Sequence, residues 1–124
     1  MSTRTTGNAG EEAAAQYLSG KGYEIAGRNY RAYDGGKRVG ELDIIAVYGE
    51  CVVFAEVKTR KQGSMTSGAE AVGAVKRRRL LSAATLWLME NECELQPRFD
   101  VVEVINMPDG GRTFNHIENA FGEE

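Results

Sequence analysis

The chain has 124 residues, of which 42% are hydrophobic and 27% charged, a balance typical of one globular domain. No apolar run approaches the roughly 20 residues that cross a bilayer, and the polar N-terminus lacks a signal-peptide core, so we expect a cytoplasmic protein with no membrane partner. Two cysteines and one histidine are too few for a disulfide framework or a Cys/His zinc site. A net charge of −3 argues against a nonspecific nucleic-acid coat protein but does not exclude a local basic groove.

The pattern of apolar segments predicts a single domain over 1–124, with residues 1–7 as a flexible tail. The glycines and charges of 32–39 predict a mobile loop, and 61–66 a polar loop. Ser-x-x-Glu at 67–70 has the form of a capping box at the start of a long helix. In chain order we expect a helix from near Asn8 to Gly20 or Gly22, strands at 23–31, 40–47 and 51–59, a helix from Ser67 to about Asn91, and strands at 98–106 and 113–117.

The strands at 40–47 and 51–59 are apolar on both faces, which is typical of a central sheet covered by helices on both sides. The order α-β-β-β-α-β-β therefore predicts an α/β fold in which a central mixed β-sheet is flanked by helices.

These two strands contain charged residues at spacing two, so each pair is expected to share a face. Residues 49–50 suit a two-residue turn that begins with glycine. Counting back from that turn places Asp43 opposite Glu56 and Glu41 opposite Lys58. Like charges directly opposite each other are destabilising, so we expect a cation between Asp43 and Glu56. Glu41 and Lys58 are expected to form a favourable cross-strand pair.

Both expected helices place a charged residue on an apolar face. Lys76 lies within the stripe of the long helix, where it either extends its ammonium group to the edge or reaches the carboxylates or a phosphate. Glu11 either caps the first helix or faces the sheet as a third acidic group. The basic run at 76–79, taken alone, is interpreted as a solvated face.

Two carboxylates on adjacent strands, with a lysine two residues after the second, favour a Mg²⁺ site for phosphodiester hydrolysis. Mg²⁺ prefers oxygen ligands and needs only one or two carboxylates when substrate phosphate completes its coordination. The ion would polarise the phosphate and acidify a bound water. Lys58 could then orient that water or stabilise the developing negative charge.

Asp43 followed by Glu56-Val57-Lys58 resembles the Asp…(Asp/Glu)-x-Lys signature of restriction-endonuclease-like nucleases. More closely, the chain resembles the YraN-type family of predicted endonucleases, which are related to archaeal Holliday-junction resolvases. The matching segments are Gly10-Glu11, Arg28-Asn29-Tyr30, the stretches 40–45 and 54–60, Lys76 and Arg98-Phe99-Asp100.

The resemblance implies that Asp43 and Glu56 bind Mg²⁺, or Mn²⁺ in its place, with Glu11 as a further acidic group. It implies a catalytic role for Lys58, with Glu41 and Lys76 as supporting positions. The resulting hypothesis is a metal-dependent endonuclease acting on nucleic acid, with structured or branched DNA as the expected substrate. A homodimer would fit such a substrate by analogy with the resolvases.

Two alternatives remain. In one, the chain is a nucleic-acid-binding or DNA-processing accessory protein without cleavage activity, and the acidic composition weakens that hypothesis. In the other, it is a protein-interaction module whose strand charges pair with each other. The basic residues expected to line a nucleic-acid groove are Arg28, Arg31, Arg60 and Lys61, together with Lys37 and Arg38.

Overall fold

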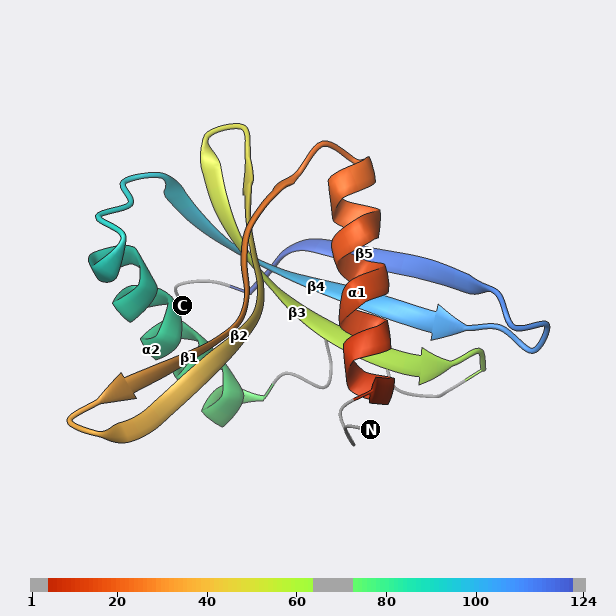
Figure 1. The fold of residues 1–124 in the computed structure, drawn as a ribbon, viewed down its shortest axis with the longest axis horizontal. Coiled ribbons are helices and arrows are strands. Elements are labelled where there is room, and N and C mark those ends of the chain that lie inside the picture. Colours follow the sequence, from red (N-terminus) through yellow and green to blue (C-terminus); the bar gives the residue numbers. More distant parts are fainter. Residues whose placement is uncertain (1–4, 64–72, 122–124) are drawn as a thin grey trace.

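The computed structural model describes residues 5–63 and 73–121, and gives the side chains from residue 9 onward (Figure 1). Its element order, α-β-β-β-α-β-β, is the predicted one. The elements are α1 (Thr5–Gly20), β1 (Glu24–Asp34), β2 (Lys37–Tyr48), β3 (Cys51–Lys61), α2 (Ala74–Glu90), β4 (Gln96–Asn106) and β5 (Arg112–Phe121).

The five strands form one mixed sheet in the order β1-β2-β3-β4-β5. Neighbouring strands are antiparallel except β3 and β4, which run parallel. A parallel pair requires a crossover connection, and α2 lies in the connection between β3 and β4. The predicted central mixed sheet is thereby confirmed.

A helix covers each face of the sheet, and a separate apolar core lies under each helix. In Figure 1, α1 crosses the central strands, whereas α2 lies beside the β1–β2 half of the sheet. Alternate residues of β3 enter the two cores, as predicted from its apolar pattern. The α1-side core includes Ala14, Leu18, Ile44, Val53, Ala55 and Val102; the α2-side core includes Leu42, Ile45, Val52, Phe54, Leu80 and Ala83.

The prediction of a mobile loop at 32–39 is wrong. β1 continues to Asp34 and β2 begins at Lys37, so that Gly35 and Gly36 form a tight turn between them. Both glycines have positive φ, 62° and 83°, which is the combination that a type I′ hairpin turn requires. The glycines indicated a turn and not a long irregular segment.

Other element boundaries differ from the prediction by a few residues. α1 begins at Thr5, so residues 5–7 of the expected tail are helical. β5 extends to Phe121 and is longer than expected. The described part of α2 begins after Gly73, which has extended geometry and no side-chain cap bond, and ends before Asn91 as predicted. The predicted capping box and the helix start at Ser67 lie outside the described residues.

The register predicted for the β2–β3 hairpin is confirmed from Tyr48–Cys51 to Ile44–Ala55. Gly49 has φ of 61°, in agreement with its predicted place as the first central residue of the turn. The ladder ends at the Ile44–Ala55 pair. The two strands therefore separate at the positions of Asp43 and Glu56.

Candidate functional site

Asp43 lies where the regular alternation of β2 side chains breaks. Leu42 and Ile45 both pack in the α2-side core, whereas Ile44 packs on the α1 side. The β1–β2 register places Asn29 beside Asp43, and Asn29 has φ of 55°. Positive φ within a strand rotates the chain locally and is tolerated by asparagine better than by most residues. Simple alternation therefore does not describe β2 at this point.

Asp43 and Glu56 meet where β2 and β3 separate. The Val57 backbone N–H donates to Oδ2 of Asp43 at 2.9 Å. Burial, then a hydrogen bond with Glu56 and the charge of Glu56, raise the pKa of Asp43 to about 8. Burial also acts to raise the pKa of Glu56, but the hydrogen bonds from Asp43 and Lys76 lower it overall. Burial and the neighbouring Glu56 thus favour the protonated form of Asp43 near neutral pH, and the protonated carboxyl group can donate a hydrogen bond to Glu56.

Two lysines flank this pair. Nζ of Lys76, from α2, lies 2.9 Å from Oε2 of Glu56, whose side chain is only 7% exposed. Burial lowers the pKa of Lys58, and the contact with Lys76 and the charge of Lys76 lower it further. Of the two alternatives for Lys76, the structure places its ammonium group at the carboxylates. Lys58 and Lys76 thus concentrate positive charge beside Glu56.

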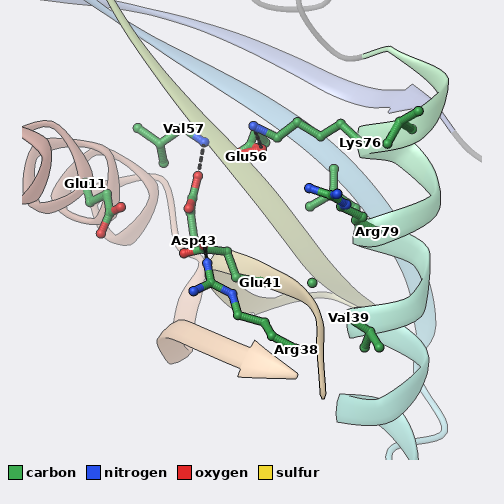
Figure 2. Close-up of a pocket in the computed structure, with 12 residues that line it drawn as sticks. Glu11, Arg38, Val39, Glu41, Asp43, Glu56, Val57, Lys76 and Arg79 are labelled. Atoms are coloured by element: carbon green, nitrogen blue, oxygen red, sulfur yellow. Dashed lines mark hydrogen bonds and ion pairs between the residues drawn. The ribbon is translucent and has the colours of Figure 1, made fainter. Parts of the chain in front are cut away.

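Glu11 approaches the same site from α1, as Figure 2 shows. The preceding Gly10 packs so closely on β3 that an added Cβ would lie 2.4 Å from Oγ1 of Thr59. The negative charge of Glu11 contributes to the raised pKa of Asp43. Its Oε1 is buried and has no hydrogen-bond partner among the described residues. The structure thus places Glu11 beside Asp43, with one carboxyl oxygen available for a ligand.

Glu11, Asp43 and Glu56 line a cleft of about 780 Å³ between α1, the β2–β3 separation and α2 (Figure 2), whereas Lys58 is not among its described lining residues. Within 5–63 and 73–121, no three Asp, Glu, His or Cys side chains are close enough to form a ready-made metal cage. The acidic centre is therefore the Asp43–Glu56 pair, with Glu11 nearby. The other lining residues are Arg38, Val39, Gly40, Glu41, Val57, Val75, Lys76, Arg79 and Leu80.

The prediction that Glu41 pairs with Lys58 is wrong. Glu41 forms an ion pair with Arg38 three residues earlier on β2. The reason is that the β2–β3 ladder ends at Ile44–Ala55, so the two strands no longer hold their side chains opposite each other at Glu41. Glu41 still lines the cleft.

Of the basic residues expected at a nucleic-acid groove, Arg38 lines the cleft, whereas Arg28, Arg31, Arg60 and Lys61 are not among the lining residues in the part of the chain that the structure describes. Arg28 pairs with Glu12 of α1 at 2.6 Å, and Arg60 pairs with the buried Glu103 at 3.1 Å. Arg31 is exposed on the edge strand β1.

Sequence reasoning missed Arg79, which does line the cleft. The basic run at 76–79 was interpreted as a solvated face, yet Lys76 and Arg79 both point into the cleft. Their spacing of three places them on neighbouring positions of one helix face. That spacing, combined with the placement of Lys76, was the observation that could have identified Arg79.

A second buried polar cluster surrounds Asp100 on β4, outside the cleft. Arg98 donates to both carboxylate oxygens at 2.9 and 2.8 Å, His116 lies 2.7 Å away, and the Asn119 N–H donates at 3.0 Å. Burial acts to raise the pKa of Asp100, but the contacts with His116 and Arg98 lower it overall. This cluster joins β4 to β5 and Tyr23, which accepts a bond from Arg98 at 2.7 Å.

The model of the family described as Uncharacterised protein family UPF0102 matches residues 10–104. The chain belongs to this family. It is 47% identical to a UPF0102 protein of Symbiobacterium thermophilum over 120 residues, covering 96% of this chain and 98% of the relative. A UPF0102 protein of Caldanaerobacter subterraneus is 39% identical over 124 residues, covering 98% of each. One from Vibrio campbellii is 39% identical over 126 residues, covering 99% and 97%.

The matched segment includes the cleft residues Glu11, Asp43, Glu56 and Lys76, and also Lys58. The family predicted from the sequence is confirmed. The names of these relatives state no activity. No helix within 5–63 and 73–121 is both long and apolar enough to span a membrane.

Proposed function

We propose that this protein is a Mg²⁺-dependent endonuclease that hydrolyses phosphodiester bonds in DNA. The observation that supports this proposal most directly is that Asp43 and Glu56 meet at the cleft, where burial and the neighbouring Glu56 raise the pKa of Asp43. Two neighbouring buried carboxyl groups resist carrying two negative charges, and a divalent ion between them would stabilise both charges. Structured or branched DNA is the substrate class that the resemblance to resolvase-like nucleases implies.

The residues present fit a Mg²⁺ ion. Asp43 and Glu56 would hold it, and the unpartnered Oε1 of Glu11 is available to an ion-bound water. Mg²⁺ keeps several waters and takes only one or two carboxylates when substrate phosphate contributes oxygens, so a third direct carboxylate ligand is not needed. When bound, the ion would supply polarisation of the scissile phosphate and a lowered pKa for an attacking water. Mn²⁺ would be expected to substitute.

The surrounding side chains have separate parts in this proposal. Lys58 would orient the attacking water or stabilise charge on the phosphate oxygens, since its ammonium group is desolvated beside the acidic pair. Lys76 holds the Glu56 carboxylate at 2.9 Å and so fixes its direction. Arg38 holds Glu41 at the β2 wall of the cleft.

A cleavage assay tests the proposal. Four-way, flapped and linear DNA, together with matched RNA, are incubated with Mg²⁺ or EDTA. We expect Mg²⁺-dependent cleavage of at least one DNA substrate by the wild type, and loss of that cleavage in Glu56→Gln and Lys58→Met. Glu50→Gln, in the exposed β2–β3 turn, is the control and retains activity. Cleavage that persists in Glu56→Gln contradicts the proposal.

A nucleic-acid-binding protein without cleavage activity is the second candidate. The three cations among the described residues that line the cleft favour it, because lysine and arginine can bind phosphate without a metal ion. The same assay separates the two functions, because binding without cleavage, and undiminished by EDTA, would support this candidate.

A further inference from the structure

The charges that line the cleft are paired unevenly. Arg38 pairs with Glu41, and Lys76 pairs with Glu56. On the acidic side, Asp43 and Glu56 both line the cleft, and Glu11 has a buried carboxyl oxygen that has no hydrogen-bond partner among the described residues. On the basic side, the guanidinium of Arg79 forms no ion pair or hydrogen bond with any described residue. The cleft therefore has unsatisfied negative and positive groups at the same time.

The guanidinium of Arg79 is directed into this space. Figure 2 shows it extending from α2 between the ends of Lys76 and Arg38 and toward the sheet. Four acidic residues line the same cleft, yet Arg79 pairs with none of them. An arginine held beside carboxylates without pairing is available to an anion that enters the cleft from outside.

Gly40 fixes the backbone from which Arg79 extends. A Cβ at Gly40 would lie 2.3 Å from the Arg79 carbonyl oxygen and 3.3 Å from the Ala83 Cβ. Only glycine allows β2 and α2 to approach this closely. Because the contact is to backbone, it sets the position of this turn of α2 over the cleft and holds Arg79 in place.

We propose that Arg79 binds a backbone phosphate of the nucleic acid in this cleft. The inference rests on the proposed function and adds a phosphate-binding residue to it. A phosphodiester next to a divalent ion matches both unsatisfied sides of the cleft, because the ion neutralises Asp43 and Glu56 while the phosphate pairs with Arg79. The planar guanidinium donates two parallel hydrogen bonds to phosphate oxygens.

The neighbouring arginines provide matched controls. Arg78 is exposed and does not line the cleft. Arg77 lies over the Phe121 ring, 5.5 Å from its centroid, and packs on the other side of α2. Arg78→Ala therefore removes the same charge from the same helix without removing the proposed phosphate contact.

The experiment measures binding of a noncleavable fluorescent DNA duplex across a salt series, in Mg²⁺ and separately in EDTA. We expect Arg79→Ala to weaken binding about tenfold and to lower the slope of log affinity against log salt by about one. Arg78→Ala should leave the slope unchanged. Arg79→Lys should restore the slope but only part of the affinity, because lysine retains the charge but not the bidentate geometry. Equal slopes for Arg79→Ala and Arg78→Ala would overturn the proposal.

The design separates this proposal from the proposed function. A lower slope in Arg79→Ala, together with normal Mg²⁺ binding by Glu56→Gln, would support the phosphate site and reject the metal site. Loss of Mg²⁺ binding in Glu56→Gln, together with equal salt slopes for Arg79→Ala and Arg78→Ala, would support the metal site and reject the phosphate site. Arg79 is exposed, so thermal unfolding of its variants should match that of the wild type.

Discussion

Replacing Asp43 with asparagine should remove a pH-dependent loss of stability from the metal-free protein. An asparagine amide can donate to Glu56 and accept from the Val57 N–H as the protonated Asp43 does. It cannot ionise, however. The variant should therefore keep the local hydrogen bonds and lose only the titration.

The direction and magnitude of this change in the free energy of unfolding follow from the pKa of Asp43, which folding raises from 3.8 to about 8. Between these values the folded state binds more protons than the unfolded state, so stability falls as pH rises and levels off above about pH 8. Each pH unit contributes at most about 1.4 kcal/mol. Between about pH 5 and pH 8 the wild type should therefore lose up to about 4 kcal/mol relative to Asp43→Asn.

Chemical denaturation in EDTA at both pH values measures this difference directly. Asp34→Asn, at the exposed β1–β2 turn, is the control and should follow the wild type. Added Mg²⁺ should restore stability to the wild type at the higher pH but not to Asp43→Asn. A difference between wild type and Asp43→Asn that does not change with pH would refute the reasoning.

Two further substitutions test the framework around the cleft. Gly40→Ala should lower the free energy of unfolding by about 1–3 kcal/mol, because the added Cβ would lie 2.3 Å from the Arg79 carbonyl oxygen. Gly20→Ala is the control, because a Cβ at Gly20 would have no neighbour within 4 Å. Equal denaturation midpoints for the two variants would contradict this packing argument. Asp100→Asn should cost about 1–3 kcal/mol, since it removes the buried carboxylate that Arg98 contacts at 2.8 Å and leaves Arg98 the longer 3.9 Å contact with Glu118, and it should leave Mg²⁺ binding intact. An unfolding curve unchanged from wild type would show that the cluster contributes little.

The parts of the fold that depend on local pattern were predictable from the sequence. The Gly49 turn was enough to predict the β2–β3 register by counting back along both strands, because a slip of one residue would move every side chain to the other face of the sheet. The same register brings Asp43 and Glu56 together. The apolar residues on both faces of these strands likewise predicted a helical layer on each side of the sheet.

What the sequence could not supply depends on contacts between distant elements. The β2–β3 ladder ends at Ile44–Ala55 and so does not hold Glu41 and Lys58 opposite each other, and this end of the ladder is not visible in a side-chain pattern. The spacing of three places Arg79 on the same helix face as Lys76, but the packing of α2 against Gly40, which sets this face over the cleft, is not visible in the sequence. The long β1–β2 hairpin was missed because paired glycines are common in loops as well as in tight turns.

Mg²⁺ titration of the purified protein by calorimetry, with Glu56→Gln measured alongside, tests the central claim most directly. The account predicts binding to the wild type, with release of the Asp43 proton, and no binding to Glu56→Gln. Equal binding of Mg²⁺ by the two proteins would contradict the assignment of the metal site to the Asp43–Glu56 pair.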